Sequence, residues 1–107
     1  MASEIPGPYS IGSDLWPGLS RLTEESGEVI QVIGKMIGGH GENSHYDGTD
    51  LRDCLTLEIA DLLAAISFVV DKNDLNWAWI NERRDMKRDT YERWHAEGRA
   101  LTGEQSR

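Results

Sequence analysis

The sequence is poor in cysteine, in basic residues and in long hydrophobic runs. Its single cysteine, Cys54, cannot form an internal disulfide, so we expect a reducing cytosol. Eleven Lys and Arg against nineteen Asp and Glu give a net charge of −8, which argues against nucleic acid or an anionic membrane as a partner. The most apolar run, residues 59–70, is interrupted by Asp61 and is too short to cross a bilayer. We therefore expect a soluble protein, and the N-terminus shows no secretory signal.

The length and the glycines indicate how the chain is organised. A chain of 107 residues is near the size at which one core gives only modest stability, so we expect a single domain over 1–107 that self-associates. Residues 1–12 contain two Pro and two Gly and are interpreted as an extended N-terminal arm. Four glycines in residues 38–50 indicate a loop, and residues 98–107 are interpreted as a flexible tail.

The segment that ends near residue 37 has the periodicity of a helix. Pro17 fits its first turn, and Ser13 and Asp14 are candidate caps. Apolar residues recur at three- and four-residue steps, which predicts one apolar stripe. The stripe consists of Leu19, Leu22, Val29, Val32, Ile33 and Met36.

Two further helices are predicted after the loop. The second follows a cap at Thr49 or Asp50 and is apolar almost all round, which is typical of a buried helix. The third runs from about Asn76 to Glu97, with Gly98 as its stop signal. We find no strand pattern, so the predicted fold is all-α: a helical bundle built from an antiparallel helix pair plus a third helix and completed by oligomerisation.

Two acidic motifs lie within these helices. EESGE at residues 24–28 puts Glu24 and Glu28 within roughly 40° of each other around the helix, and EIAD at residues 58–61 puts Glu58 and Asp61 three residues apart in an apolar stretch. Two unit charges 4 Å apart repel by about 4 kcal/mol at an effective dielectric near 20, so a cluster of these acids needs a positive partner. A ligand set made only of carboxylates favours Mg²⁺ or Mn²⁺ over zinc.

Each motif also has a structural interpretation. EExxE on a surface helix is commonly a solvated face, and an acid of the ExxD motif can pair with a base of the third helix, such as Arg83, Arg84 or Arg88. The two motifs together are more specific than either one, because an antiparallel hairpin can bring them to face each other across one groove.

The pair of motifs resembles the EExxE and ExxD signature of the MazG-like, all-α nucleoside triphosphate pyrophosphohydrolase superfamily, over roughly residues 14 to 97. The resemblance implies hydrolysis of an NTP or dNTP to the monophosphate and pyrophosphate, a dependence on Mg²⁺, and a homodimer or homotetramer. It also implies the cytoplasm of a bacterium or of a phage-infected cell. The glycine-rich connection is long for the simplest members. The implied metal ligands are Glu25, Glu28, Glu58 and Asp61, and the implied catalytic residues are Glu24 and Glu25, with Glu24 as an added ligand or a base that orients water.

Basic residues of the third helix are candidates for binding the phosphates. Arg84, Lys87 and Arg88 share a face by their spacing, and Tyr91 continues the row. An ordinary helix laced with salt bridges is the alternative, because acids interleave with these bases. Lys35, on the first helix, is a further phosphate candidate.

Base recognition is expected near the N-terminal arm. Trp16 can stack on a base, and Ile11 and Ser13 are near enough in sequence to line the same pocket. A stacking Trp on an open arm favours a large ring, so we expect a purine deoxynucleotide such as dGTP.

Two other functions compete with the hydrolase. Helical bundles that bind two irons use ExxH motifs, and the chain contains Glu92 with His95 and Glu42 with His45. A non-enzymatic acidic interaction protein is the other alternative, and it predicts carboxylates dispersed over the exterior.

Overall fold

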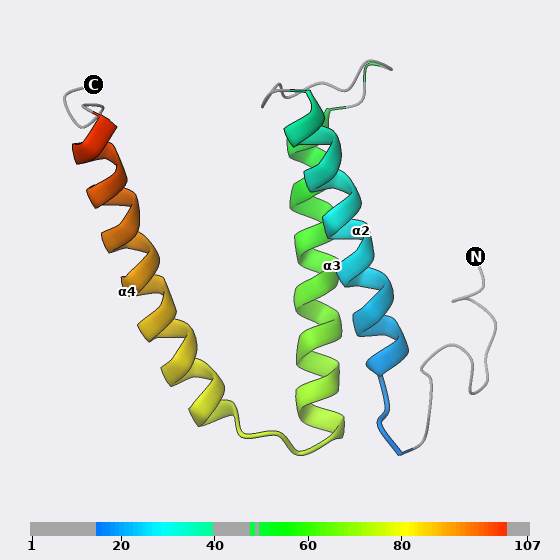
Figure 1. Cartoon of the computed structure of the whole chain (residues 1–107). Coiled ribbons are helices and arrows are strands. Elements are labelled where there is room, and N and C mark those ends of the chain that lie inside the picture. Colours follow the sequence, from blue (N-terminus) through cyan, green and yellow to red (C-terminus); the bar gives the residue numbers. More distant parts are fainter. Residues whose placement is uncertain (1–14, 40–47, 49, 103–107) are drawn as a thin grey trace. The chain divides into compact units, whose positions relative to one another are not determined.

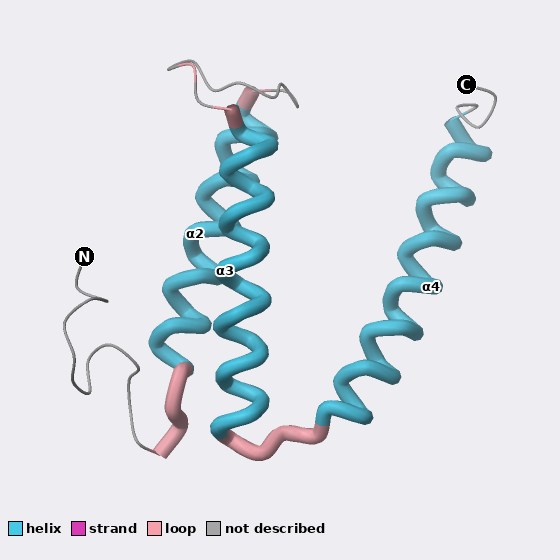
Figure 2. Tube along the Cα trace, turned by 180° about the vertical axis from the view of Figure 1, so that it is seen from behind, coloured by secondary structure: helices cyan, strands magenta, loops and turns pink. Residues whose placement is uncertain are grey.

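The computed structural model describes residues 15–39, 48 and 50–102. These residues form three helices, α2 (Leu19–Gly38), α3 (Leu51–Lys72) and α4 (Trp77–Thr102) (Figure 1). The parts of the chain that are described contain no strand (Figure 2). The all-α fold class predicted from the sequence is therefore confirmed, while oligomerisation stays a prediction.

Helices α2 and α3 form an antiparallel hairpin. They lie side by side and run in opposite directions (Figures 1 and 2). Val32 supplies the buried side chain of α2, and it belongs to the apolar stripe predicted there. The buried side chains of α3 are Leu51, Ala65, Val69 and Val70. The antiparallel helix pair is therefore confirmed.

The start of α2 differs from the prediction, because the helix begins at Leu19 and Pro17 lies outside it. Gly18 precedes the helix with a left-handed φ of 92°, a conformation that glycine adopts readily. A Cβ on Gly18 would lie 2.7 Å from the Cδ2 atom of Phe68, so glycine is also needed for the close approach to α3. The predicted caps Ser13 and Asp14 lie outside the described residues.

Side-chain hydrogen bonds fix both ends of α3. The carboxylate of Asp50 accepts from the backbone N–H groups of Arg52 at 2.9 Å and Asp53 at 3.2 Å, which confirms one of the two predicted caps. At the other end, the Asn73 amide donates to the carbonyl oxygens of Val69 at 2.8 Å and Pro17 at 3.0 Å. The second bond ties the segment before α2 to the end of α3 and holds the hairpin in register.

Helix α4 belongs to a second compact unit, which begins at Asn76. The Asn76 side chain accepts a hydrogen bond from the backbone N–H of Trp79 at 3.0 Å, as expected for a helix start. The predicted stop at Gly98 is wrong, because α4 continues to Thr102. Gly98 does not have the positive φ of a terminating glycine, and an interior glycine weakens a helix by only about 1 kcal/mol.

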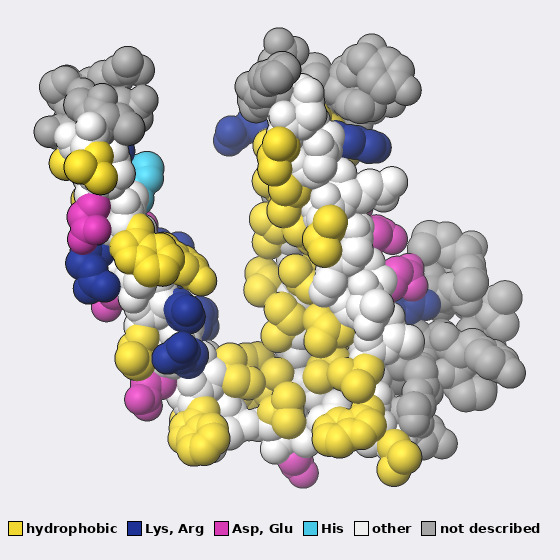
Figure 3. Space-filling model, viewed as in Figure 1, with side chains coloured by type: hydrophobic (Ala, Val, Ile, Leu, Met, Phe, Trp, Pro, Cys, Tyr) yellow, Lys and Arg dark blue, Asp and Glu magenta, His cyan; other side chains and the backbone are white. Residues whose placement is uncertain are grey.

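Much of the hairpin's apolar surface is exposed. Hydrophobic side chains run along it from one end to the other (Figure 3). Ile30, Ile37, Leu57 and Leu63 are each more than half exposed. No helix in the described part of the chain is long and apolar enough to span a bilayer.

Candidate metal centre

One acid of each motif occupies an inward-facing position of the hairpin. Glu58 lies seven residues from both Leu51 and Ala65, which are buried, and Glu25 lies seven residues before buried Val32. Because seven residues are about two helical turns, these acids continue the core faces of their helices. The helix period that buries the core therefore also directs the carboxylates of α2 and α3 toward each other.

Three carboxylates gather at this point. One oxygen each from Glu25, Glu58 and Asp61 can be chosen so that the three atoms lie within 4.8 Å of one another. Glu25 and Glu58 are half-buried, whereas Asp61 is exposed. The cluster thus has two members between the helices and one at the solvent edge, and it is drawn from both motifs.

Glu28 belongs to the same cluster through Glu58. A hydrogen bond between the two side chains is the largest cause of a raised pKa at Glu58, followed by desolvation and by the charges of Glu28, Asp61 and Glu25. Two carboxylates are both acceptors, so this contact is favourable only with a proton or a cation between them. The contact therefore marks a place where positive charge is needed.

Glu25 is also perturbed. Desolvation is the largest cause of its raised pKa, and the charges of Glu28, Asp61 and Glu24 raise it further. The Oε2 atoms of Glu25 and Glu58 are buried and have no hydrogen-bond donor. A buried carboxylate oxygen without a donor is costly, so both atoms are free to accept a cation.

Arg21 is the basic side chain that acts on this cluster. It pairs with Glu24 at 3.2 Å and lowers the pKa of Glu25, against the four causes that raise it. Arg21 was not among the residues predicted for the site. The signal was its spacing, because residues three and four apart on a helix are neighbours.

The residues fit a hard divalent cation. All the donors are carboxylate oxygens, which suit Mg²⁺ or Mn²⁺, and the two unpartnered oxygens lie within the cluster. Exposed acidic groups also cluster without a metal, so the half-buried orphan oxygens are the stronger evidence for a site.

The other predicted residues do not join this cluster. Lys35 lies ten residues beyond Glu25, about 15 Å along the axis of α2. Trp16 is 54% exposed just before α2, whereas Ile11 and Ser13 lie outside the described residues. The base-binding role of these three residues stays a prediction.

The predicted phosphate ligands of α4 are engaged on their own helix. Arg84 pairs with Asp85 at 3.0 Å and Arg88 with Glu92 at 3.7 Å, as the salt-bridge alternative expected. The Tyr91 ring lies 5.9 Å from that of Trp94. Lys87 is exposed on the same helix. All four residues are exposed, and their role in binding phosphate stays a prediction.

Neither alternative function gains a site from the described residues. His95 is not part of the acidic cluster, and Glu42 and His45 lie outside the described residues. The interaction-protein alternative expects dispersed carboxylates, whereas all five acids of the two motifs take part in one group of interactions.

Comparisons with known proteins add no relative. No protein-family model matches the sequence. No curated protein and no solved structure matches it either. The function is therefore inferred from the residues of the hairpin.

Proposed function

We propose that this protein is a Mg²⁺-dependent nucleotide pyrophosphohydrolase that converts an NTP or dNTP to the monophosphate and pyrophosphate. The observation that carries the proposal is the meeting of Glu25 with Glu58 and Asp61 between two helices. The spacing of the acids in EExxE and ExxD, which resembles the MazG-like signature, supplies the class of reaction.

The carboxylates have distinct roles in this proposal. Glu25, Glu58 and Asp61 would hold Mg²⁺, and Glu28 would complete the site from the adjacent turn of α2. When bound, Mg²⁺ neutralises phosphate charge and increases the acidity of coordinated water. Because the protein's own site is negative, a triphosphate with about four negative charges would be repelled without the cation.

Glu24 is suited to act next to these ligands. It lies on the same side of α2, is more exposed than Glu25, and is oriented by Arg21 at 3.2 Å. A carboxylate paired with a guanidinium is held in one orientation and can accept a hydrogen bond from water. Glu24 would therefore orient the attacking water, while Glu25 would serve as ligand and catalytic residue.

The direct test is a product assay with the purified full chain. A panel of NTPs and dNTPs, including dGTP, is incubated with Mg²⁺, with Mn²⁺ or with EDTA, and nucleotide products and pyrophosphate are quantified. We expect monophosphate and pyrophosphate in equal amounts, and only with a divalent cation. Release of diphosphate and orthophosphate instead would place the cut at the terminal bond, and no turnover of any nucleotide would reject the proposal.

A metal-binding measurement separates the site from the reaction. Isothermal titration with Mn²⁺ in the absence of nucleotide should show saturable binding that Glu58→Gln abolishes. If Mn²⁺ binds but no nucleotide is hydrolysed, the centre exists and the substrate class is wrong. If neither is seen, the carboxylate cluster is not a metal site.

A further inference from the structure

The face of α2 that points away from α3 carries no charge. All five charged residues of the helix fall within an arc of about 100° when each residue is assigned 100° of rotation. The opposite arc is exposed, and on it Ile30 is 68% and Ile37 71% exposed. A helix that faces only water normally carries charged and polar side chains there, so this face is unusual for a free surface.

Small and large residues alternate along this face with a seven-residue period. Ser20, Gly27 and Gly34 form one row, and Thr23, Ile30 and Ile37 form the adjacent row. All six are exposed, and we call them the α2 outer seam. Two rows at this spacing are the pattern with which one helix packs along another.

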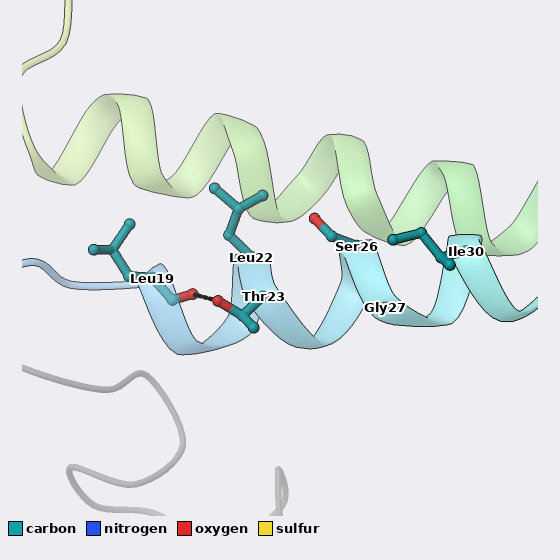
Figure 4. Close-up of a pocket in the computed structure, with 6 residues that line it drawn as sticks. All are labelled: Leu19, Leu22, Thr23, Ser26, Gly27 and Ile30. Atoms are coloured by element: carbon teal, nitrogen blue, oxygen red, sulfur yellow. Dashed lines mark hydrogen bonds between the residues drawn. The ribbon is translucent and has the colours of Figure 1, made fainter.

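The glycines of the seam leave room for a neighbour. A Cβ placed on Gly27 or on Gly34 would meet nothing within 4 Å. Gly27, Thr23 and Ile30 also border a shallow hollow that extends from this face toward α3, together with Leu19, Leu22 and Ser26 (Figure 4). The Thr23 hydroxyl donates to the carbonyl of Leu19 at 3.0 Å, so this polar group already has a partner within α2.

We propose that the α2 outer seam binds the same seam of a second copy of this chain, with the two helices antiparallel. In this pairing Gly27 faces the partner's Ile30, and Ile30 faces the partner's Gly27. The same register places Thr23 against the partner's Gly34 and Ser20 against the partner's Ile37. Each layer then joins a small residue to a larger one, so the surface is complementary to itself under a two-fold axis.

The charges beside the seam favour the same arrangement. Glu24 and Lys35 lie along one edge of the seam, within about 20° of each other around the helix. In the antiparallel register Glu24 is about 3 Å along the axis from the partner's Lys35, which allows two equivalent ion pairs. A parallel pairing instead puts Gly27 against the partner's Gly27 and Ile30 against the partner's Ile30. The glycine layers would then leave gaps, and the isoleucine layers would be crowded.

This interface leaves the proposed metal ligands of α2 uncovered, and Glu24, the residue proposed to orient water, lies at its edge. The seam lies on the side of α2 opposite Val32, whereas Glu25 and Glu28 face α3 or the edge beside it. The pairing therefore covers the apolar face of α2 without covering the acidic cluster.

Sedimentation velocity of the full chain over a concentration series tests the pairing. The wild type should dimerise, and Gly27→Leu/Gly34→Leu should weaken the dimer by roughly tenfold to a hundredfold, because each added side chain meets the partner's Ile30 or Thr23. Gly98→Leu, on α4, is the matched control, since its Cβ also meets nothing within 4 Å. It should leave the dimer constant unchanged.

Circular dichroism of the same variants makes the outcome unambiguous. The seam variant should keep its helical signal, because leucine replaces glycine at open helical positions. A wild type that is monomeric at every concentration, a dimer that tolerates both leucines, or a seam variant that loses its helices would each overturn the proposal. The last result would mean that the chain covers the seam with one of its own segments.

Cysteine crosslinking tests the direction of the pairing. In a Cys54→Ser background, chains with Ser20→Cys mixed with chains with Ile37→Cys should give an oxidised dimer, whereas either chain alone should not. The two positions are seventeen residues apart, about 25 Å along one helix, so a parallel pair gives the reverse result. Crosslinking of each variant with itself would overturn the antiparallel pairing.

Discussion

The hairpin and α4 use acidic residues in opposite ways. Residues 1–75 contain thirteen Asp or Glu and four Lys or Arg, whereas residues 76–107 contain six acids and seven bases. On α4 the acids alternate with bases, as in the pairs of Arg88 with Glu92 and Arg93 with Glu97. In the hairpin, acids from two helices meet one another. The net charge of −8 is therefore concentrated in residues 1–75, where Glu28, Glu58 and Asp61 have no base within four residues.

The difference shows what a carboxylate cluster requires. An exposed acid paired with a base contributes little to stability, and it needs no further positive partner. A half-buried acid that faces other acids raises the free energy of the folded state unless a proton or a cation joins it. Glu25 and Glu58 are in this second situation, and their raised pKa values are its direct consequence.

The largest effect is expected from removing one charge of the cluster. Asp61→Asn should lower nucleotide turnover by about a thousandfold or more, because a ligand of the required cation is lost while the shape is kept. Asp89→Asn, the same change on α4, should leave turnover unchanged. Initial rates of monophosphate release from both variants and the wild type provide the measurement.

Stability separates this expectation from a purely structural role of Asp61. Without metal, Asp61→Asn should unfold at the same temperature as the wild type or higher, because repulsion with Glu25 and Glu58 is relieved. A variant that fails to fold would mean that Asp61 forms a stabilising ion pair instead.

The second effect is stabilisation by the cation itself. A ligand that binds only the folded state at a hundred times its Kd adds about 2.7 kcal/mol to the free energy of unfolding. For a chain of this size we expect Mg²⁺ to raise Tm by roughly 10 °C or more. Glu58→Gln should abolish the rise, whereas Glu97→Gln on α4 should retain it. Thermal melts in EDTA and in excess Mg²⁺ give both values.

An unchanged Tm in the wild type on adding Mg²⁺ or Mn²⁺ would contradict the metal centre. An equal rise in wild type and Glu58→Gln would place the bound ion elsewhere on the acidic hairpin.

Sequence periodicity was enough to predict the helices and the meeting of the two motifs. The apolar stripe that includes Val32 predicts the face of α2 that packs on α3, and the glycine-rich segment predicts the reversal of direction. Helix ends were predicted less well, because they depend on tertiary contacts. Nothing local shows that Gly18 must approach Phe68, or that Gly98 keeps an ordinary helical backbone.

Within the site, sequence spacing could group the acids but could not show which of them point toward the other helix. The EExxE motif alone treats Glu24, Glu25 and Glu28 alike, whereas the fold brings Glu25 and Glu28 to the acids of α3 and pairs Glu24 with Arg21. The missing information was the register of α2 against α3, to which the hydrogen bond from Asn73 to Pro17 contributes. The α4 residues could not be placed in a site by spacing, because spacing orders residues only within one helix.

The third effect is a pH dependence specific to the metal-free hairpin. Glu25 and Glu58 have folded-state pKa values raised above the ordinary 4.5, so they bind protons more tightly in the folded state. Their contribution to stability is present below pH 4.5 and is lost as the pH rises through the raised values. Glu25→Gln/Glu58→Gln should therefore gain stability over the wild type as the pH increases from 4.5 to 7.5, in urea titrations with EDTA.

The difference in the free energy of unfolding between the wild type and the double variant removes the contribution of the remaining carboxylates. A difference that is constant over this range, or that shrinks with rising pH, would mean that the two glutamates do not repel their neighbours in the folded state.

The smallest effect is expected for an ion pair on α4, which provides the contrast to the acids of the hairpin. Arg93 and Glu97 are four residues apart with their charged atoms 3.9 Å from each other, and both side chains are mostly exposed. A double-mutant cycle with Arg93→Gln and Glu97→Gln should therefore give a coupling of only about 0.3–0.5 kcal/mol, and salt should weaken it further. The sign is as informative as the size, because these opposite charges attract, whereas Glu25→Gln and Glu58→Gln remove a repulsion. A coupling energy on α4 as large as that between the hairpin acids would contradict the distinction between solvated and half-buried carboxylates. The acidic cluster would then give no reason to expect a bound cation.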